Sequence, residues 1–274
     1  MILQNDIIFS KVMSGPYSIK MIKHGLDTVF SSVVGPTPPS GFDRVFGNNT
    51  PAQISAVSAE ISANGYTSAQ VEEIYGWKIG DTITIPRSTG DTIEVRISGY
   101  NHYPLSDGSG TAGILLEMTH CLPELKPISI YYGYPDSDIH TTYLPSVKST
   151  FPIEWQNIIK TTIHTNYYNK ASRYNYNAEL FIPLEYELYG SVYYGYASYL
   201  TGGTLYEWYK INKAGTNRIK SYDANGDGVL DTTCRYWTSS NATSGGMVVV
   251  TDVGGVAGTS DFSTARGVSF AFCV

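Results

Sequence analysis

The chain has 274 residues, which is enough for one large domain or for one domain with a small appendage. Its formal net charge is −6 and only 15% of its residues are charged, so it lacks the basic surface that nucleic-acid binding needs. No apolar run reaches the roughly 18 residues of a membrane helix, and the N-terminus lacks the features of a signal peptide. We therefore expect no membrane span, and synthesis in a cytoplasm without a signal peptide.

The first segment, residues 1–46, is predicted to be a small N-terminal β module. Short alternating runs at 18–22 and 27–30 predict a β-hairpin. The run at 34–41 is rich in proline and glycine, and it can neither continue a helix nor join the interior of a sheet. A small module joined to the rest of the chain by such a linker is typical of a segment that attaches a protein to a larger assembly. Residues 47–274 would then form the main domain.

The main domain is predicted to open with two helices. Thr50 is a suitable N-cap with Pro51 at the first helical position, and apolar residues follow at helical spacing up to Gly65. Thr67 and Gln70 form a capping-box pattern that begins the second helix.

A β-hairpin is predicted next, with strands at 81–85 and 92–97 around a turn at 89–91. In its second strand Ile93, Val95 and Ile97 alternate with Thr92, Glu94 and Arg96. The pattern predicts one buried face and one face in water.

The rest of the chain is predicted to begin with helices and to end with strands. Another strand follows at 114–116, residues 144–163 read as a helix and its exit, and a short helix at 184–189 ends at Gly190. The last 40 residues read as three strands, at 235–238, 247–251 and 267–274. In the last of them Val268, Phe270 and Phe272 alternate with small residues, which predicts a core strand that completes the sheet. Helices early and strands late, with long irregular loops between them, indicate the α+β class.

A calcium-type loop precedes these last strands. Oxygen donors at positions 1, 3, 5, 7 (a backbone carbonyl) and 9 are supplied by Asp223, Asn225, Asp227, Val229 and Asp231. Gly226 permits the tight turn, but position 12 is Cys234 instead of a bidentate Glu, so the loop is not an EF-hand. We predict a structural calcium ion here; the alternative is a surface turn without an ion.

Tyrosine is concentrated between residues 167 and 209, which hold 12 of the 23 tyrosines. A flat apolar ring with a polar tip suits sugar rings and protein interfaces. The candidate binding residues are Tyr193, Tyr194, Tyr196, Tyr199, Tyr206, Trp208 and Tyr209. The alternative is that these rings pack between subunits or in a half-buried core.

Catalytic patterns are absent from the sequence. The five histidines show no HxxxH or HExxH spacing, and Glu185 and Glu187 are two apart on a predicted helix and so do not share a face. The three cysteines, Cys121, Cys234 and Cys273, have no CxxC spacing and are interpreted as buried, reduced thiols. We therefore do not expect an enzyme.

An ordered set of motifs carries a family resemblance. The motifs are Gly80 to Ile85, ISGYNH at 97–102, DGSGTAG at 107–113, Leu144-Pro145, Leu180 to Gly190, YWTSS at 236–240 and GVSFAFC at 267–273. In this order they resemble an uncharacterised domain family of phage tail proteins and of prophage-bearing Gram-positive bacteria. That family looks like a distant branch of the C-type-lectin fold.

Departures from the family pattern bear on its charged positions. The Asn-His pair at 101–102 is followed by Tyr103 instead of Asp, and Ser239 and Ser269 each stand where the pattern has Arg. These losses argue against a shared charged site. The resemblance implies a structural, hydrogen-bonded role for His102.

The resemblance implies a C-type-lectin-like domain over 47–274 and a structural role in a bacteriophage virion. We expect a tail-fibre or baseplate-associated adhesin or receptor-binding protein at the particle surface that recognises host glycan or protein. A capsid decoration or head-fibre protein and a bacterial surface adhesin are the alternatives. The expected partners are other virion proteins through the N-terminal module, and copies of the chain itself, with a trimer preferred by analogy.

Overall fold

The computed structural model describes residues 18–19, 33–34, 38–129, 133–167, 173–195, 204–243, 245–259 and 261–274. Both helices and sheets are present, so the α+β class is confirmed. Within these residues no helix is long and apolar enough to cross a membrane.

A five-stranded antiparallel sheet forms the centre of the body. Its strands, in spatial order, are β3 (Thr82–Pro86), β4 (Thr92–Tyr100), β5 (Ile114–Met118), β14 (Ala271–Cys273) and β8 (Leu180–Phe181). The last strand of the chain is therefore inserted between β5 and β8, and Phe272 pairs with Leu116 on one side and Leu180 on the other. The prediction that the closing strand completes the core sheet is confirmed.

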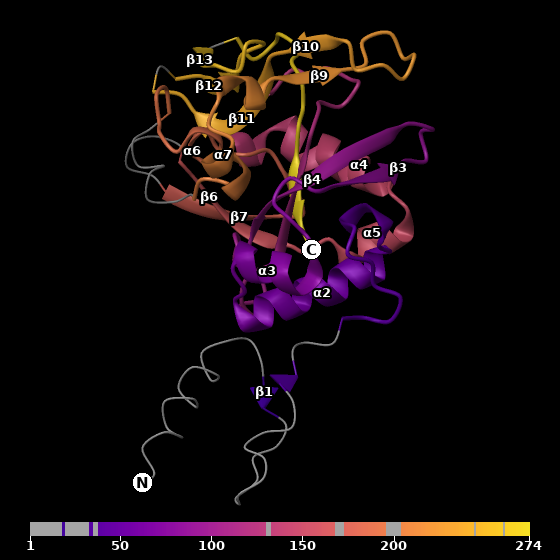
Figure 1. The fold of residues 1–274 in the computed structure, drawn as a ribbon. Helices are drawn as coiled ribbons and strands as arrows, with labels where there is room; N and C mark the ends of the chain where they lie inside the picture. The colour runs from indigo at the N-terminus through magenta and orange to yellow at the C-terminus, as the bar shows by residue number, and fades with distance from the viewer. Residues whose placement is uncertain are drawn as a thin grey trace, which may run out of the picture.

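Two helices close to the start of the main body form as their capping residues predict. Helix α2 (Pro51–Asn64) and helix α3 (Ser68–Tyr75) each begin with a complete capping box, in which Thr50 pairs with Gln53 and Thr67 with Gln70. Each helix ends at a glycine in the left-handed conformation. In Figure 1 both lie at one end of the body, with β9 to β13 at the other.

Both faces of the central sheet are covered. Leu116, Phe270 and Phe272 belong to the larger core cluster, which includes the apolar stripes of α2 and α3, whereas Leu115 and Ala271 belong to a second cluster on the opposite face. The expected alternation of large and small residues in the closing strand is thereby confirmed.

The prediction that one face of the second hairpin strand lies in water holds at Thr92 and Glu94 but is wrong at Arg96. Arg96 is only 7% exposed, because helix α7 (Glu207–Ile211) covers that face of β4 and places Trp208 and Tyr209 over the guanidinium. Periodicity cannot detect this cover, because it comes from a segment more than 100 residues later in the chain.

The predicted helix at 144–163 is divided. A π-helical turn (Ile139–Tyr143) leads into α4 (Leu144–Ser149), and a separate helix α5 (Ile153–Ile158) follows. Pro152 is the reason for the break, because it cannot donate a helical hydrogen bond and instead stands as the N-cap of α5. The expected exit then becomes strand β6 (Thr162–Tyr167).

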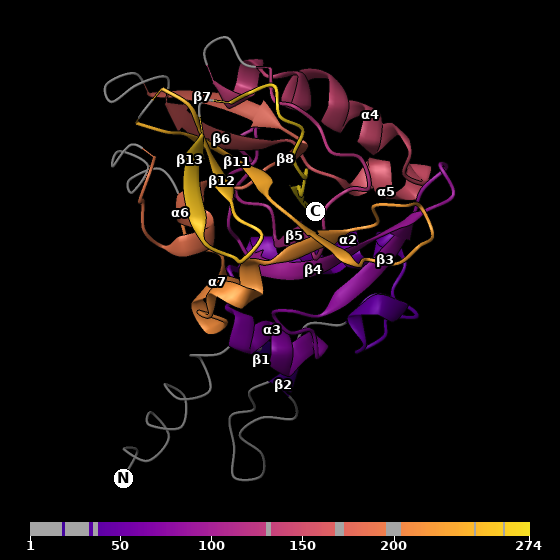
Figure 2. The same cartoon turned by 90° about the horizontal axis from the view of Figure 1, so that it is seen from above.

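Smaller sheets complete the body, as Figures 1 and 2 show. They are β6 with β7 (Arg173–Ala178), β9 (Lys220–Tyr222) with β10 (Thr232–Cys234), and β11 (Tyr236–Asn241) with β12 (Met247–Val250) and β13 (Val256–Thr259). The short helix α6 (Glu185–Tyr189) ends at Gly190 as predicted. The chain also forms 3₁₀ turns at Phe46–Asn48, Tyr134–Asp136 and Gly215–Arg218.

The N-terminal module lies largely outside the described residues. A two-residue antiparallel pair joins β1 (Ser18–Ile19) to β2 (Val33–Val34), whereas the predicted second strand at 27–30 falls in the undescribed part. The expected boundary at 46/47 is too late, because Phe46 is 1% exposed in the core and packs edge-on against Trp77.

A buried ionic cluster lies on the side of the sheet that α7 covers. Glu117 of β5 is fully buried, and its two carboxylate oxygens accept hydrogen bonds from Lys220 Nζ at 2.7 Å and Arg96 Nη2 at 3.1 Å. Tyr209 also donates its hydroxyl to Glu117 at 2.7 Å. Burial alone would raise the pKa of Glu117, but the two cations lower it to about 2.

Candidate functional site

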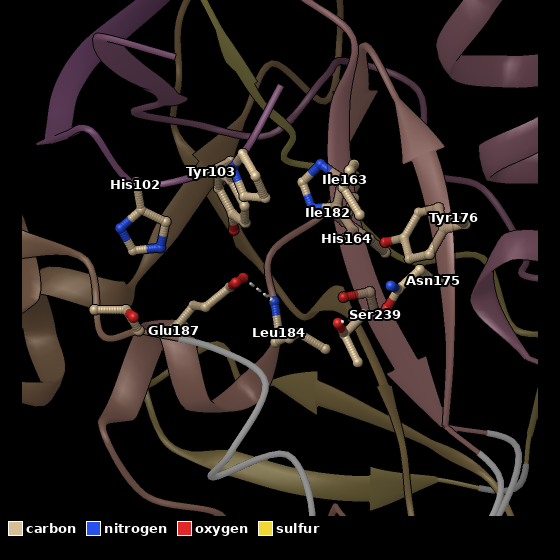
Figure 3. A pocket seen from close by; sticks show the side chains of 13 residues that line it. His102, Tyr103, Ile163, His164, Asn175, Tyr176, Ile182, Leu184, Glu187 and Ser239 are labelled. Carbon is tan, nitrogen blue, oxygen red and sulfur yellow. Dashed lines mark hydrogen bonds between the residues drawn. The ribbon is translucent and has the colours of Figure 1, made fainter. Parts of the chain in front are cut away.

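A polar pocket of about 390 Å³ opens beside the central sheet. It is lined by His102, Tyr103, Pro104, Ile163, His164, Thr165, Asn175, Tyr176, Ile182, Leu184, Glu187, Thr204 and Ser239. These residues come from the end of β4, from β6 and β7, from α6 and from β11, so the pocket exists only in the folded chain. Figure 3 shows His102 and Glu187 on one side and Asn175 and Tyr176 on the other.

Glu187 provides the acidic group of the pocket. It is 2% exposed, and its Oε2 accepts a 2.8 Å hydrogen bond from the backbone N–H of Leu184, the N-cap of its own helix. The hydroxyl of Tyr206 lies 3.5 Å from the same oxygen and 2.9 Å from the hydroxyl of Tyr103. Burial raises the pKa of Glu187 to about 7, so this carboxyl can donate or accept a hydrogen bond near neutral pH.

His102 provides a buried ring nitrogen, Nε2, that has no hydrogen-bond partner among the described residues. The preceding Asn101 adopts a positive φ of 51° and donates its side-chain amide to the Tyr66 carbonyl, which fixes the turn after β4. The His102 ring packs edge-on against Tyr103 and Tyr206. Burial lowers the pKa of His102 to about 3, so the ring is neutral.

The opposite side of the pocket is more aromatic. The ring of His164 on β6 packs in a tilted arrangement 4.0 Å from Phe181 and 5.4 Å from Tyr176, measured between ring centroids. Its Nε2 lies 2.8 Å from the Thr162 hydroxyl, and burial lowers the pKa of the imidazole well below its usual value. Asn175 is exposed at the mouth, where Thr165 donates its hydroxyl to the Asn175 amide oxygen at 3.0 Å.

The pocket is therefore neutral to weakly acidic. Both histidines are uncharged at neutral pH, and no lysine or arginine is among the described residues that line it. Its volume lies in the range of small-molecule sites, and its lining alternates aromatic faces with hydroxyl, amide, imidazole and carboxyl groups. Such a lining can hold a small, uncharged, hydroxyl-rich ligand.

The predicted binding aromatics do not form one surface. Tyr206 and Tyr209 are at most 1% exposed, and Trp208 is half-buried against the central sheet. Tyr206 and Tyr209 are core residues, so the prediction that they contact a receptor is wrong, whereas Trp208 packs against that core and keeps part of its surface exposed. Tyr196 and Tyr199 lie outside the described residues.

Tyr193 and Tyr194 remain as a surface pair. Their side chains are 64% and 45% exposed. The buried carboxylate of Glu185 holds this turn by accepting hydrogen bonds from the backbone N–H groups of Tyr193, Tyr194 and Gly195. Glu185 thus binds the backbone of the loop at 193–195, whereas Glu187 lines the pocket. This agrees with the expectation that the two side chains do not share a helix face.

The calcium-type loop lies on the surface between β9 and β10. Both carboxylate oxygens of Asp223 accept backbone hydrogen bonds, from Gly226 at 2.7 Å and Gly228 at 2.8 Å, and Asp227 accepts one from Val229 at 2.9 Å. The two glycines adopt positive φ angles, as a tight loop requires. Among the described residues no three or more acidic, histidine or cysteine side chains come together as a metal site would require, so the structure does not support the calcium site and calcium stays a prediction from the oxygen spacing.

Sequence reasoning did not single out this pocket. The resemblance implies only a structural role for His102, and no sequence pattern brings His164 and Asn175 to a site, because hairpin β6–β7 is not predicted. The available signal was the presence of polar residues, His102 and Glu187, inside otherwise apolar motifs. No local pattern indicates that the two meet.

In comparisons with known proteins, no family model, no curated protein and no solved structure matches this chain. The pocket geometry and the sequence motifs are therefore the basis for inferring a function.

Proposed function

We propose that this chain is a non-enzymatic component of a bacteriophage particle, associated with the tail fibre or baseplate. We further propose that its main body is a C-type-lectin-like domain and that the polar pocket binds one unit of a host-surface glycan. The single observation that carries the binding role is the lining of that pocket, which is uncharged or weakly acidic and offers groups that can hydrogen-bond to the hydroxyls of a sugar.

The meeting of the resemblance motifs in one core supports the lectin-like fold. The motif at 180–190 reaches the motif at 236–240 through two hydrogen bonds, Ser239 N to Pro183 O and Glu185 N to Ser240 Oγ, both 2.9 Å. It also pairs with the closing strand through β8 and β14. In the motif at 107–113, a Cβ on Gly113 would lie 1.9 Å from the Ser58 carbonyl oxygen, so only glycine fits against α2.

The electrostatics of the pocket favour a neutral sugar over an acidic one. A carboxylate or phosphate ligand would meet Glu187 and two uncharged imidazoles, with no described cation in the lining to offset the loss of hydration. A neutral sugar offers hydroxyl donors to His102 Nε2 and Glu187 and an apolar face to Tyr176. Sugar binding of this kind needs no catalytic group.

The glycan proposal is tested on an array of bacterial surface glycans, followed by calorimetry on the sugars that bind.

Asn175→Ala removes one polar group at the mouth of the pocket without opening the core, and we expect it to weaken the affinity for the sugar about tenfold, the value of one hydrogen bond. Glu187→Gln keeps the shape of the buried carboxyl and tests its charge. Val253→Ala, at a side chain 72% exposed and outside the pocket, is the matched control and should bind as the native chain does.

Two results would contradict the glycan role. One is the absence of binding to any neutral glycan by a folded chain. The other is binding that Asn175→Ala leaves intact while substitution of the exposed Tyr193 and Tyr194 abolishes it, which would move the site to the tyrosine pair.

The virion role is tested by imaging particles labelled with an antibody against this chain. Label at the tail tip is the expected result. Label on the capsid would favour the decoration-protein alternative, and purified particles that lack the chain would overturn the virion role altogether.

A further inference from the structure

Two of the three cysteines lie in direct contact. The Sγ atoms of Cys121 and Cys234 are 3.1 Å apart, which is closer than two sulfur atoms approach in ordinary packing. Both side chains are buried, and both are free thiols in this structure. Cys273 is held separately in β14, where its backbone pairs with Leu115 of β5.

The surrounding backbone fixes this sulfur pair. Cys121 follows β5 and donates its backbone N–H to the Ser221 carbonyl at 2.9 Å, while Cys234 ends β10 and pairs with Lys220 of β9. Gly267, which begins the closing segment, passes directly beside both sulfurs. A Cβ at that position would come within 2.6 Å of Cys234 Sγ and 2.7 Å of Cys121 Sγ, so glycine leaves the space that the pair occupies.

We propose that Cys121 and Cys234 form an intramolecular disulfide when the folded chain meets an oxidant, and that this bond fastens the β9–β10 ribbon to the central sheet. The oxidant is a low-molecular-weight disulfide. The Cys234 thiolate attacks one sulfur of that compound and releases its other half as a thiol. Cys121 then attacks the Cys234 sulfur of the mixed disulfide and releases the second thiol. Both cysteines lose a proton, the protein is oxidised by two electrons, and the small disulfide is reduced to two thiols.

The two thiols differ in a way that suits this order of attack. The hydrogen bond between the two sulfurs lowers the pKa of Cys234, with a further contribution from the Lys220 ammonium, whereas burial raises the pKa of Cys121. Cys234 keeps 7% of its surface exposed. Cys121 is fully buried, but it contributes to the lining of a surface cavity of about 450 Å³ together with His120, Asp223 and Leu230, so this cavity reaches the Cys121 side of the pair.

The disulfide would restrain the ends of the calcium-type loop. Residues 223–231 form the connection between β9 and β10, and Cys234 lies at the end of the return strand. Joining Cys234 to Cys121 closes a loop across 113 positions of sequence separation. A cross-link over so long a span restricts the unfolded chain strongly and the folded chain little, because the sulfurs are already in contact.

The test uses the full chain, purified under reducing conditions and then incubated, folded, with oxidised glutathione. Thiols are counted by alkylation after unfolding, and peptide mass mapping identifies the linked residues. We expect the count to fall from three to one, with one peptide pair that joins Cys121 to Cys234. The oxidised chain should melt about 5–15 °C higher than the same chain after reduction.

Matched variants keep the result interpretable. Cys273→Ala should still form the bond and retain no free thiol, whereas Cys234→Ala should keep both of its thiols. Oxidation of the unfolded chain should give a mixture of the three possible pairs, which separates a folded-state contact from random pairing. A folded native chain that keeps three thiols in excess oxidised glutathione, or a bond that involves Cys273, would overturn the inference. Neither outcome depends on glycan binding.

Discussion

The carboxylate of Glu117 lies between two cations in the interior of the molecule. Lys220 Nζ donates to Glu117 Oε1 and also to the Met118 carbonyl and Ser269 Oγ, each at 2.7 Å. Ser269 stands where the family pattern has Arg, and its loss argues against a charged site shared with that family. A cation is nevertheless present beside Ser269, because Lys220 reaches it from β9.

Within this cluster, removing the charge of Glu117 should lower the free energy of unfolding more than removing the charge of Lys220. Glu117→Gln leaves Lys220 and Arg96 without a counter-charge in a buried site, and we expect it to lower the free energy of unfolding by about 3–5 kcal/mol. Lys220→Met leaves the Arg96–Glu117 pair balanced and should cost clearly less. Urea unfolding of the two variants measures the difference. A Lys220→Met loss as large as that of Glu117→Gln would contradict this account.

At the scale of elements, local signals succeeded where one segment determines its own conformation. The capping boxes and terminal glycines of α2 and α3 gave both helices their limits, because caps satisfy backbone groups within a few residues. Hairpin β6–β7 and the ribbon β9–β10 were missed. Their strands hold polar residues such as Asn166 and Ser221, so no regular alternation marks them.

The ribbon β9–β10 should become more stable when calcium binds its loop. If Asp223, Asn225, Asp227, Asp231 and the Val229 carbonyl hold the ion, binding to the folded state alone raises the melting temperature. We expect a higher melting temperature in millimolar calcium than in EDTA, and we expect Asp227→Ala to abolish the difference.

Asp261→Ala is the matched control for the calcium experiment. Asp261 also accepts hydrogen bonds from nearby backbone N–H groups, those of Ser263 and Thr264, but it lies outside the loop. This variant should keep the response to calcium. Identical melting curves of the native chain in calcium and in EDTA would refute the calcium prediction.

Across the whole molecule, burial keeps the described histidines neutral. It lowers the pKa of His102 to about 3 and that of His120 to about 4, and it lowers the pKa values of His140 and His164 as well. The unfolded chain binds protons on these imidazoles below about pH 6.5, and the folded chain binds them only at lower pH. Stability should therefore fall as the pH decreases from about 6.5 towards 4, by up to about 1.4 kcal/mol per pH unit for each histidine.

Glu187 opposes this trend. Its pKa is raised from 4.5 to about 7, so the folded chain retains a proton that the unfolded chain loses. Its stabilising contribution is present below about pH 4.5 and is lost as the pH rises to about 7. We expect thermal unfolding between pH 4.5 and 7.5 to show a melting temperature that rises with pH in the native chain and rises more steeply in Glu187→Gln. Parallel curves for the two proteins would show that Glu187 is not protonated in the fold.

The sequence by itself determined the class of the fold, the two capped helices, the first hairpin and the core role of the closing strand. Each of these follows from contacts within a few residues or from an apolar period, such as the one that places Phe270 and Phe272 on one face. The exposed Tyr193 and the loop from Asp223 were also recognisable, because tyrosine density and oxygen spacing are local properties.

Only the tertiary structure decided which residues share a site. His102 and Glu187 are 85 positions apart and line one pocket, Glu117 and Lys220 are 103 apart and form an ion pair, and Cys121 and Cys234 are 113 apart with touching sulfurs. The ion pair and the sulfur contact arise because the β9–β10 ribbon packs near the central sheet, whereas the pocket forms where the end of β4, hairpin β6–β7, α6 and β11 meet. The free energy of that packing depends on the whole buried surface, and no short stretch of sequence encodes it.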